Sequence, residues 1–189
     1  MNKPLLIVVT GRPGSGKTTL AHALAREICC PVFCRDEFKE GLCVTERKKH
    51  AELPPDTNGK VYEVFFRAVE LVLQARMSIV AEAAFQHKLW APKLTPLLEF
   101  AAIRIVVCSV DSHAARSRFI KRGLANLRRE QFHRDTAIHA AREGVVLPVG
   151  NYDPPRLPVP TLKVDTTNGC QPDLAGILTF VLQPGEATP

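Results

Sequence analysis

The chain has 189 residues, a length typical of one domain with room for a small lid. Hydrophobic residues make up 46% and charged residues 23%, a composition that excludes collagen, a coiled coil and wholesale disorder. The formal net charge is +6, and residues 116–134 alone hold seven Lys or Arg against one Glu, a balance of 7 − 1 = 6. This basic stretch is therefore either a solvated helix face or a site for a polyanion.

The apolar run near the N-terminus, Leu5–Val9, is too short to span a bilayer, and it lacks the cleavage site of a signal peptide. We therefore expect a cytoplasmic protein with no membrane partner. The six cysteines include no C-x-x-C pair, and no histidine stands at zinc-ligand spacing from them. Reduced thiols packed in a core are the interpretation that this spacing favours.

Short apolar runs alternate with longer amphipathic runs along the chain. The runs predict strands at Leu5–Val9, Pro31–Cys34, Ser78–Ala81, Ile103–Val110 and Leu162–Val164. They predict helices at Thr18–Cys29, Asp36–Leu42, Tyr62–Met77, from Asp111 through Arg122 with Gly123 as its end, and at Leu174–Leu182. This alternation indicates an α/β fold, a doubly wound three-layer sandwich with a mostly parallel five-stranded sheet. Ligands of such sheets bind beyond the carboxyl ends of the strands.

We expect residues 1–183 to form a single domain, with a small Arg-rich lid at about 123–135. The segment Pro148–Pro160 holds five prolines and is expected to connect its neighbours without regular structure. Residues 184–189 are expected to be a frayed tail.

A phosphate-binding loop follows the first strand. Its sequence fits G-x-x-x-x-G-K-[ST] with the residues Gly11, Arg12, Pro13, Gly14, Ser15, Gly16, Lys17 and Thr18, and Thr19 follows. Glycines allow the backbone N–H groups to turn inward around a phosphate, and the helix that follows points its N-terminus at the same anion. Lys17 can reach the β- and γ-phosphates, and the Thr18 hydroxyl can ligate Mg²⁺. The motif predicts binding of a nucleoside triphosphate, and the Lys-Thr ending favours it over a dinucleotide.

Other signatures narrow the class of phosphate-loop protein. The N-K-x-D of GTPases and the L-S-G-G-Q of transporter ATPases are both absent from the sequence. Asp111 ends an apolar strand and could serve as the acid of a Walker B motif, but a helix N-cap explains it better. The acid after the second strand, Asp36, is the better candidate for chemistry.

The chain resembles small phosphotransferases of the gluconate kinase and shikimate kinase type. It more closely resembles the AAA-like P-loop kinases grouped with chloramphenicol phosphotransferase and zeta toxin. The resemblance covers roughly residues 4–182. It rests on Gly11–Thr18, Arg35-Asp36 with Phe38-Lys39-Glu40, the strand 79–82, Arg118-x-x-x-Arg122 and Val164-Asp165-Thr166-Thr167. The phosphate loop is the specific motif among these. The chain departs from kinases with a D-x-D after the second strand, because Glu37 follows Asp36 directly.

The resemblance implies a role for each remaining candidate. Asp36 would accept the acceptor's hydroxyl proton or contact hydrated Mg²⁺, although it could instead only cap the second helix. Arg35, Glu82 and Phe85 would line the acceptor site. Glu82 could contact the substrate or metal-bound water, or alternatively pair with Arg35 or another structural cation. The resemblance also implies that Arg118 and Arg122 flank the phosphates and adenine, that Arg128 or Arg129 closes over the transferring group, and that Thr167 lies in the adenine-side loop.

The leading hypothesis is a kinase that uses ATP and Mg²⁺ to phosphorylate a hydroxyl of a small molecule. A polynucleotide or RNA-end kinase is an alternative, because the basic stretch could bind nucleic acid. An ATP-binding switch that phosphorylates no acceptor is the other alternative. The acceptor and the oligomeric state stay open, since Phe38, Phe65, Phe66, Phe85 and Trp90 are as compatible with core as with a pocket.

Overall fold

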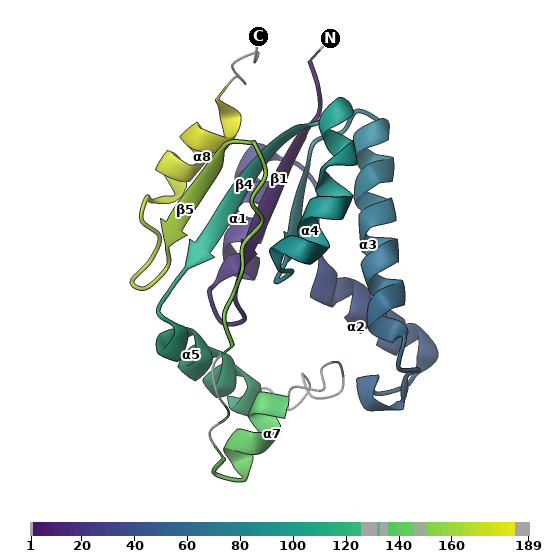
Figure 1. Cartoon of the computed structure of the whole chain (residues 1–189), viewed down its shortest axis with the longest axis vertical. Coiled ribbons are helices and arrows are strands. Elements are labelled where there is room, and N and C mark those ends of the chain that lie inside the picture. Colours follow the sequence, from purple (N-terminus) through teal and green to yellow (C-terminus); the bar gives the residue numbers. More distant parts are fainter. Residues whose placement is uncertain (1, 126–131, 133–135, 146, 148–149, 184–189) are drawn as a thin grey trace.

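A computed structural model describes residues 2–125, 132, 136–145, 147 and 150–183. The strands are β1 (Leu5–Gly11), β2 (Val32–Cys34), β3 (Ile79–Ala83), β4 (Ala102–Ser109) and β5 (Thr161–Asp165). They form one parallel sheet in the order β2-β3-β1-β4-β5, so the strand that precedes the phosphate loop lies at the centre (Figure 1). The predicted five-stranded α/β sheet is confirmed.

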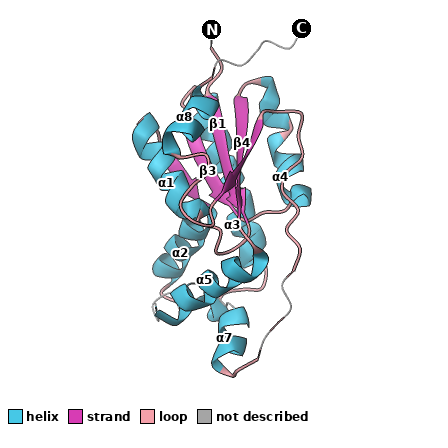
Figure 2. Cartoon of the chain, turned by 90° about the vertical axis from the view of Figure 1, so that its left-hand side faces the viewer, coloured by secondary structure: helices cyan, strands magenta, loops and turns pink. Residues whose placement is uncertain are grey.

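Helices cover both faces of this sheet (Figures 1 and 2). They are α1 (Lys17–Ile28), α2 (Arg35–Glu46), α3 (Thr57–Gln74), α4 (His87–Leu94), α5 (Ser112–Ala125), α7 (Thr136–Arg142) and α8 (Leu174–Leu182), with short 3-10 turns at His50–Glu52 and Pro96–Glu99. Successive strand residues point to opposite faces. Leu6 and Val8 accordingly pack in one core cluster with α3 and α4, whereas Ile7 and Val9 pack in the other with α1 and α8.

The structure moves several predicted helix boundaries. α2 begins at Arg35, with Cys34 at its N-cap position, so Asp36 lies in its first turn and is not its cap. α3 begins five residues before the predicted Tyr62 and ends at Gln74. α5 continues past the predicted end at Gly123, which is buried where Ile138 of α7 packs on it, so this glycine serves packing and not helix termination.

Two helices were missed, for local reasons. α4 contains Pro92 and only eight residues, and its hydrophobic periodicity is correspondingly weak. α7 has seven residues. Most of the predicted lid at 123–135 and the whole tail at 184–189 lie outside the described residues.

The described part of the proline-rich segment, residues 150–160, has no helix or strand, as predicted. Its backbone is held against the α4 side of the molecule, where His87 N donates to the Asp153 carbonyl at 2.8 Å and Arg156 N donates to His87 Nδ1 at 3.1 Å. Among the helices that the structure describes, none combines the length and apolar composition needed to cross a bilayer.

Candidate active site

The phosphate loop joins β1 to α1 at the carboxyl edge of the sheet. Gly14 and Gly16 have φ angles of +83° and +80°, the left-handed region that glycine adopts without a Cβ penalty. α1 begins at Lys17 and no side chain caps its N-terminus. A Cβ built on Gly16 would meet nothing within 4 Å, so the space in front of the helix is open. The buried hydroxyl of Ser15 has no hydrogen-bond partner among the residues that the structure describes.

These observations fit a phosphate group. An uncapped helix N-terminus offers free N–H donors to an anion, and a buried hydroxyl without a partner is costly unless a ligand or water supplies one. The loop can therefore hold the phosphates of a nucleotide. Arg12 is half-buried and Pro13 exposed in the same loop, and Thr19 is exposed in the first turn of α1.

Lys17 and Thr18 both contact Glu82, which lies on the neighbouring strand β3. Lys17 Nζ is 3.5 Å from Glu82 Oε1, and Thr18 Oγ1 donates to Glu82 Oε2 at 3.2 Å. Glu82 is 3% exposed and Lys17 is 9% exposed. The register partner of Glu82 on β1 is Val9, two residues before the loop. Of the two cations expected as alternatives, Arg35 or another structural one, the described contacts of Glu82 show the second, and that cation is the loop lysine.

Burial raises the pKa of Glu82 above its ordinary value, with Lys17 opposing the shift and Asp36 adding to it. The carboxylate oxygens of Glu82 and the hydroxyl of Thr18 are the hard oxygen ligands that Mg²⁺ prefers. Thr18 and Glu82 could thus hold the ion directly or through its waters. The sequence analysis placed the metal on Thr18 and Asp36 and expected Glu82 to contact the substrate or metal-bound water. The direct contacts of Glu82 with the loop residues Lys17 and Thr18 follow from the order of the strands in the sheet, which sequence spacing does not give.

Asp36 lies in the first turn of α2 with a side chain that is 48% exposed. Arg35 Nη1 donates to Asp36 Oδ1 at 3.2 Å, and Arg35 Nη2 donates to Asn58 Oδ1 on α3 at 2.7 Å. The charge of Asp36 acts on Glu82, so the two carboxyls share one electrostatic environment. The pair of Arg35 and Asp36 is therefore available at the edge of the open space, on the β2 side of the loop.

The arginines of α5 face the other side of the loop. Arg118 donates from Nη1 to the Thr166 carbonyl at 2.9 Å and from Nη2 to the Thr167 carbonyl. This guanidinium therefore fastens α5 to the loop after β5, where Thr167 N donates to Asp165 Oδ1 at 2.7 Å. Arg122 lies one turn further along α5. The expected lid arginines, Arg128 and Arg129, lie outside the described residues.

Asp111 caps α5, as predicted. Its Oδ1 accepts from His113 N at 2.9 Å and Ala114 N at 3.0 Å. These backbone donors, that of Ala114 first, lower the pKa of the carboxyl. The acid at the end of β4 therefore serves the helix N-terminus and not a metal.

The aromatic candidates divide between core and partly buried positions. Phe65, Phe66 and Trp90 are buried in the cluster between the sheet and α3, whereas Phe38 and Phe85 are partly buried at its border. The Phe38 and Phe65 rings meet edge to face at 5.7 Å, and Phe85 and Trp90 at 5.4 Å. Only Phe38 and Phe85 of this set keep the exposure that a substrate contact requires.

The sequence analysis missed a polar cluster behind the loop. Thr10, the residue before the loop, donates to the Ala83 carbonyl at 2.8 Å and accepts from Trp90 Nε1 at 3.1 Å. The Tyr152 hydroxyl meets Thr10 Oγ1 and lies 3.1 Å from the Phe85 carbonyl. Burial raises the pKa of Tyr152 to about 12. A tyrosine in a proline-rich segment gives no sequence signal of such a contact.

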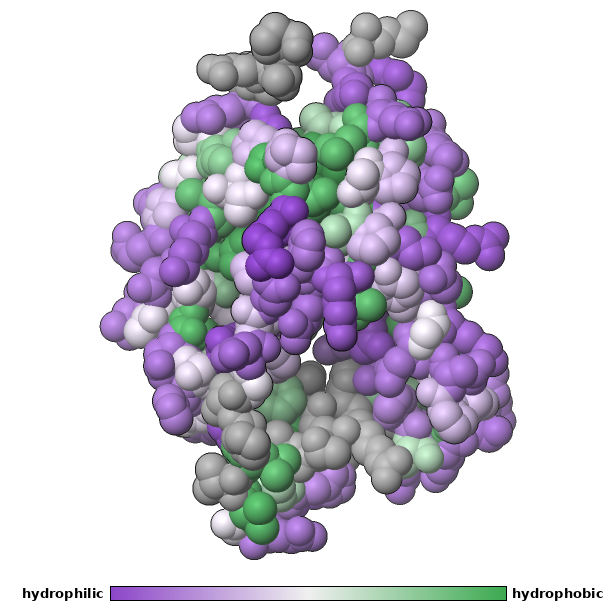
Figure 3. Space-filling view, viewed as in Figure 1, coloured by the Kyte–Doolittle hydropathy of each residue, from purple (hydrophilic) through white to green (hydrophobic). Residues whose placement is uncertain are grey.

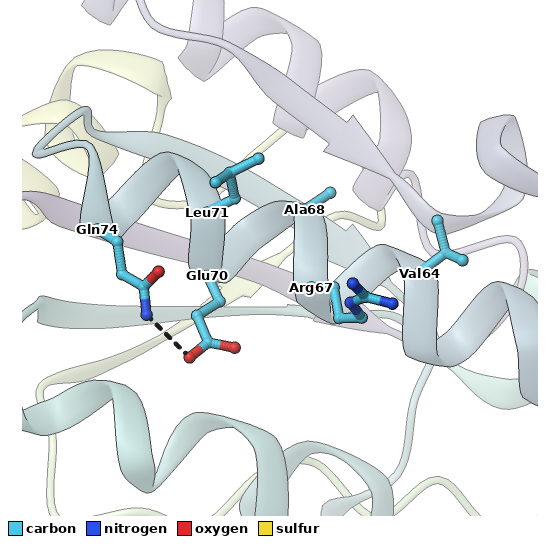
Figure 4. A pocket seen from close by; sticks show the side chains of 6 residues that line it. All are labelled: Val64, Arg67, Ala68, Glu70, Leu71 and Gln74. Carbon is cyan, nitrogen blue, oxygen red and sulfur yellow. Dashed lines mark hydrogen bonds between the residues drawn. The ribbon is translucent and has the colours of Figure 1, made fainter.

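Two of the hollows on the described surface differ in their distance from the phosphate loop. One, of about 440 Å³, borders the loop at Arg12 and is otherwise lined by the end of β4, by β5 and by residues 152–156. The other, of about 470 Å³, lies along α3 and contains none of the predicted site residues (Figure 4). Its lining comes from one helix, with Gln74 donating to Glu70 at 3.1 Å. The view of Figure 3 shows mostly hydrophilic side chains and a hollow below the sheet, between the parts that carry α5 and α2.

Residues 6–144 match the family described as AAA domain. The chain belongs to this AAA domain family. A cytidylate kinase of Pyrobaculum aerophilum is 32% identical over 83 residues, which cover 39% of this chain and 45% of that protein. The match thus spans less than half the length of that curated relative, and its activity does not transfer with it.

Solved structures share the fold of this AAA domain protein. A protein of Chloroflexus aurantiacus that is assigned as a kinase has a TM-score of 0.76 and 25% identity over 97% of this chain and 96% of its own. The APS kinase CysC of Mycobacterium tuberculosis, solved with AMPPNP and APS, has a TM-score of 0.62 at 15% identity, over 94% of this chain and 96% of its own. Together with the loop geometry, these matches establish a kinase-like P-loop nucleotide-binding protein. The predicted P-loop kinase resemblance is confirmed.

Proposed function

We propose that this protein transfers the γ-phosphoryl group of ATP to a hydroxyl of a small molecule, with Mg²⁺. The observation that carries the proposal is the convergence of Lys17 and Thr18 on buried Glu82, directly beside an uncapped phosphate loop. The buried acid costs folding free energy, which a role at the metal and the transferring group would explain.

Each side chain has a place in this reaction. Lys17 turns from Glu82 to the β- and γ-phosphates, and the loop N–H groups hold the β-phosphate. Mg²⁺ held by Thr18 and Glu82 would neutralise charge on the phosphate oxygens. Asp36 accepts the proton of the acceptor hydroxyl as its oxygen bonds to the γ-phosphorus and the bond to the ADP oxygen breaks. Arg35 holds Asp36 in position through its pair, and Phe38 and Phe85 offer an apolar wall to the acceptor.

The arginines supply the remaining positive charge. Arg118 orders the loop that contains Thr167, which we assign to the adenine side. Arg122, on the same face of α5, is assigned to the phosphates, and one of Arg128 and Arg129 to the transferring group. Fixed guanidinium donors suit a transition state that spreads charge over equatorial phosphoryl oxygens.

The test is ATP consumption by the full chain with Mg²⁺ and a library of hydroxyl-bearing metabolites and antibiotics. A product whose mass is raised by one phosphoryl group identifies the acceptor. End-labelling of oligonucleotides instead would establish the polynucleotide kinase alternative, with a steep loss of binding as salt rises. Tight ATP binding with no phosphorylated product in either screen would establish a switch protein and overturn the proposal.

Asp36→Asn separates the base from a metal ligand. We expect ATP affinity within a few fold of wild type and a drop in kcat of about 10²–10⁴, the usual contribution of a general base. Glu40→Gln, on the same helix, is the matched control and should retain activity. If Asp36→Asn abolished nucleotide binding as well, Asp36 would be a metal ligand or a fold element.

A further inference from the structure

Three side chains that the proposed reaction does not use meet where α1, β2 and α2 come together. They are His22, Cys34 and Glu37. His22 Nε2 lies 2.9 Å from Glu37 Oε1 and 3.5 Å from Cys34 Sγ. One donor atom from each residue lies within 4.8 Å of the other two. The three lone-pair donors therefore point into one small space.

Hydrogen bonds can satisfy the three groups in the metal-free protein, because the His22 N–H group can donate to Glu37 while the Cys34 thiol donates to Glu82. The three donor atoms nevertheless come from three elements and converge on one space. A cation in that space would accept a lone pair from all three at once, with loss of the thiol proton.

We propose that His22, Cys34 and Glu37 bind a borderline-soft divalent cation, of which Zn²⁺ is the representative. Imidazole nitrogen, thiolate sulfur and carboxylate oxygen are its ligands in proteins, and three protein ligands leave a fourth position open. Ligands held about 2.0–2.3 Å from zinc in a tetrahedron lie about 3.3–3.8 Å apart, so the donors need only small movements. Sulfur disfavours Mg²⁺ and Ca²⁺, which prefer oxygen.

The exposure of the three residues suits reversible binding. Cys34 is 1% exposed, whereas the side chains of His22 and Glu37 are 43% and 50% exposed. An ion can enter from the solvent side and be held by the buried sulfur. The site differs from the assigned Mg²⁺ position, because neither Thr18 nor Glu82 is among its three ligands. It lies close to that position, because Cys34 also hydrogen-bonds Glu82 and Glu37 directly follows Asp36.

The experiment is titration of the reduced, metal-free full chain with Co²⁺ in excess Mg²⁺, because a cobalt–thiolate bond gives a near-ultraviolet charge-transfer band that oxygen ligands do not. We expect one equivalent of Co²⁺ to produce the band and Zn²⁺ to remove it. His22→Ala and Glu37→Gln should weaken binding at least about 100-fold, beyond the 10–100-fold typical of outer-shell changes. Cys34→Ser should abolish the band.

Cys29→Ser is the matched control, since this thiol is exposed and outside the trio, and its band should equal that of wild type. Zn²⁺ should raise the unfolding temperature of wild type and leave that of His22→Ala unchanged. The unfolding temperature of His22→Ala without metal shows whether this variant folds. The proposal is overturned if wild type gives no band, if His22→Ala and Glu37→Gln bind Co²⁺ as wild type does, or if Cys29→Ser loses the band. Because His22 and Glu37 are half-exposed, these variants decide the question even if Cys34→Ser fails to fold.

Discussion

Lys17 and Glu82 share a nearly water-free position beside the phosphate loop, and their contact explains why a charged pair is kept there. Each would be costly to bury alone, and their 3.5 Å separation offsets part of that cost. In the proposed reaction the lysine leaves this partner for the phosphates of ATP. The pair then holds the lysine ready in the nucleotide-free protein.

Lys17→Ala removes the loop's positioned cation. We expect kcat/KM for ATP to fall by at least about 10²–10³, the range found when one transition-state donor is removed. Lys60→Ala, whose exposed lysine pairs with Asp56, is the control and should match wild type in the same coupled ATPase or kinase assay. Unchanged turnover in Lys17→Ala would refute the assignment of the loop.

Glu82→Gln tests the buried carboxyl through the pH dependence of stability. The pKa of Glu82 is raised above 4.5 in the folded chain, so the folded state binds more protons than the unfolded state as pH rises from 4.5 to the raised pKa. The free energy of unfolding of wild type therefore falls across this window relative to that of Glu82→Gln.

Urea unfolding at several pH values measures the free energy of unfolding of Glu82→Gln minus that of wild type. This difference should increase as pH rises and become constant above the raised pKa of Glu82. Glu70→Gln, on the exposed surface of α3, is the control for the substitution itself. If the free energy of unfolding of Glu82→Gln minus that of wild type instead decreases with rising pH, the contact with Lys17 outweighs burial in its effect on the pKa of Glu82.

The close approach of α5 to the phosphate loop is set by one glycine of the loop. A Cβ on Gly14 would lie 2.0 Å from the Ala115 carbonyl oxygen on α5, at a φ of +83°. Because the clash is with backbone, it cannot be relieved by a rotamer change. The helix that carries Arg118 and Arg122 is thereby kept in register with the phosphate site.

Gly14→Ala should therefore lower the free energy of unfolding by more than the roughly 1–2 kcal/mol of left-handed strain alone. Gly16→Ala is the matched control, with a φ of +80° and no atom within 4 Å of its Cβ. It should lose only the strain energy, while weakening ATP binding because its Cβ enters the anion space. Equal stabilities of the two variants in urea titrations would argue against the packing role of Gly14.

At the scale of the whole molecule, residues 150–160 of the proline-rich segment run past the sheet toward β5 (Figure 1). Tyr152 connects it to Thr10 of β1 and to the Phe85 carbonyl after β3. Thr10 and Phe85 are 142 and 67 residues away from Tyr152 in the chain, so three distant parts of the chain meet next to the phosphate loop. This contact couples the position of Phe85 to that of the loop.

Tyr152→Phe should destabilise the protein by about 1–3 kcal/mol, because the partly buried Phe85 carbonyl loses its donor. Tyr62→Phe removes a hydroxyl that bonds the Leu89 carbonyl at 2.8 Å in an exposed position, and it should cost less. Thermal unfolding of both variants beside wild type checks the order. A larger loss for Tyr62→Phe would show that the buried contact does not support the fold.

The sequence by itself determined the sheet elements, the phosphate loop and the helix cap at Asp111, because each depends on residues close together in the chain. Apolar runs buried on both faces, glycines at the turn and an acid before a helix carry their physical reason locally. The lysine and threonine of the loop were found in this way, whereas the roles of Arg118 and Thr167 were expected from the family resemblance.

Only the tertiary structure decided which side chains meet. The order β2-β3-β1 places Glu82 against Lys17 and Thr18, although 64 residues separate Glu82 from Thr18. It also brings His22 and Glu37 to Cys34 from three elements, so rules on zinc-ligand spacing do not detect them. Short or proline-containing helices such as α4 form because burial of Trp90 and Leu94 outweighs weak local propensity. Strand order and burial arise from packing of the whole chain, and no local pattern encodes them.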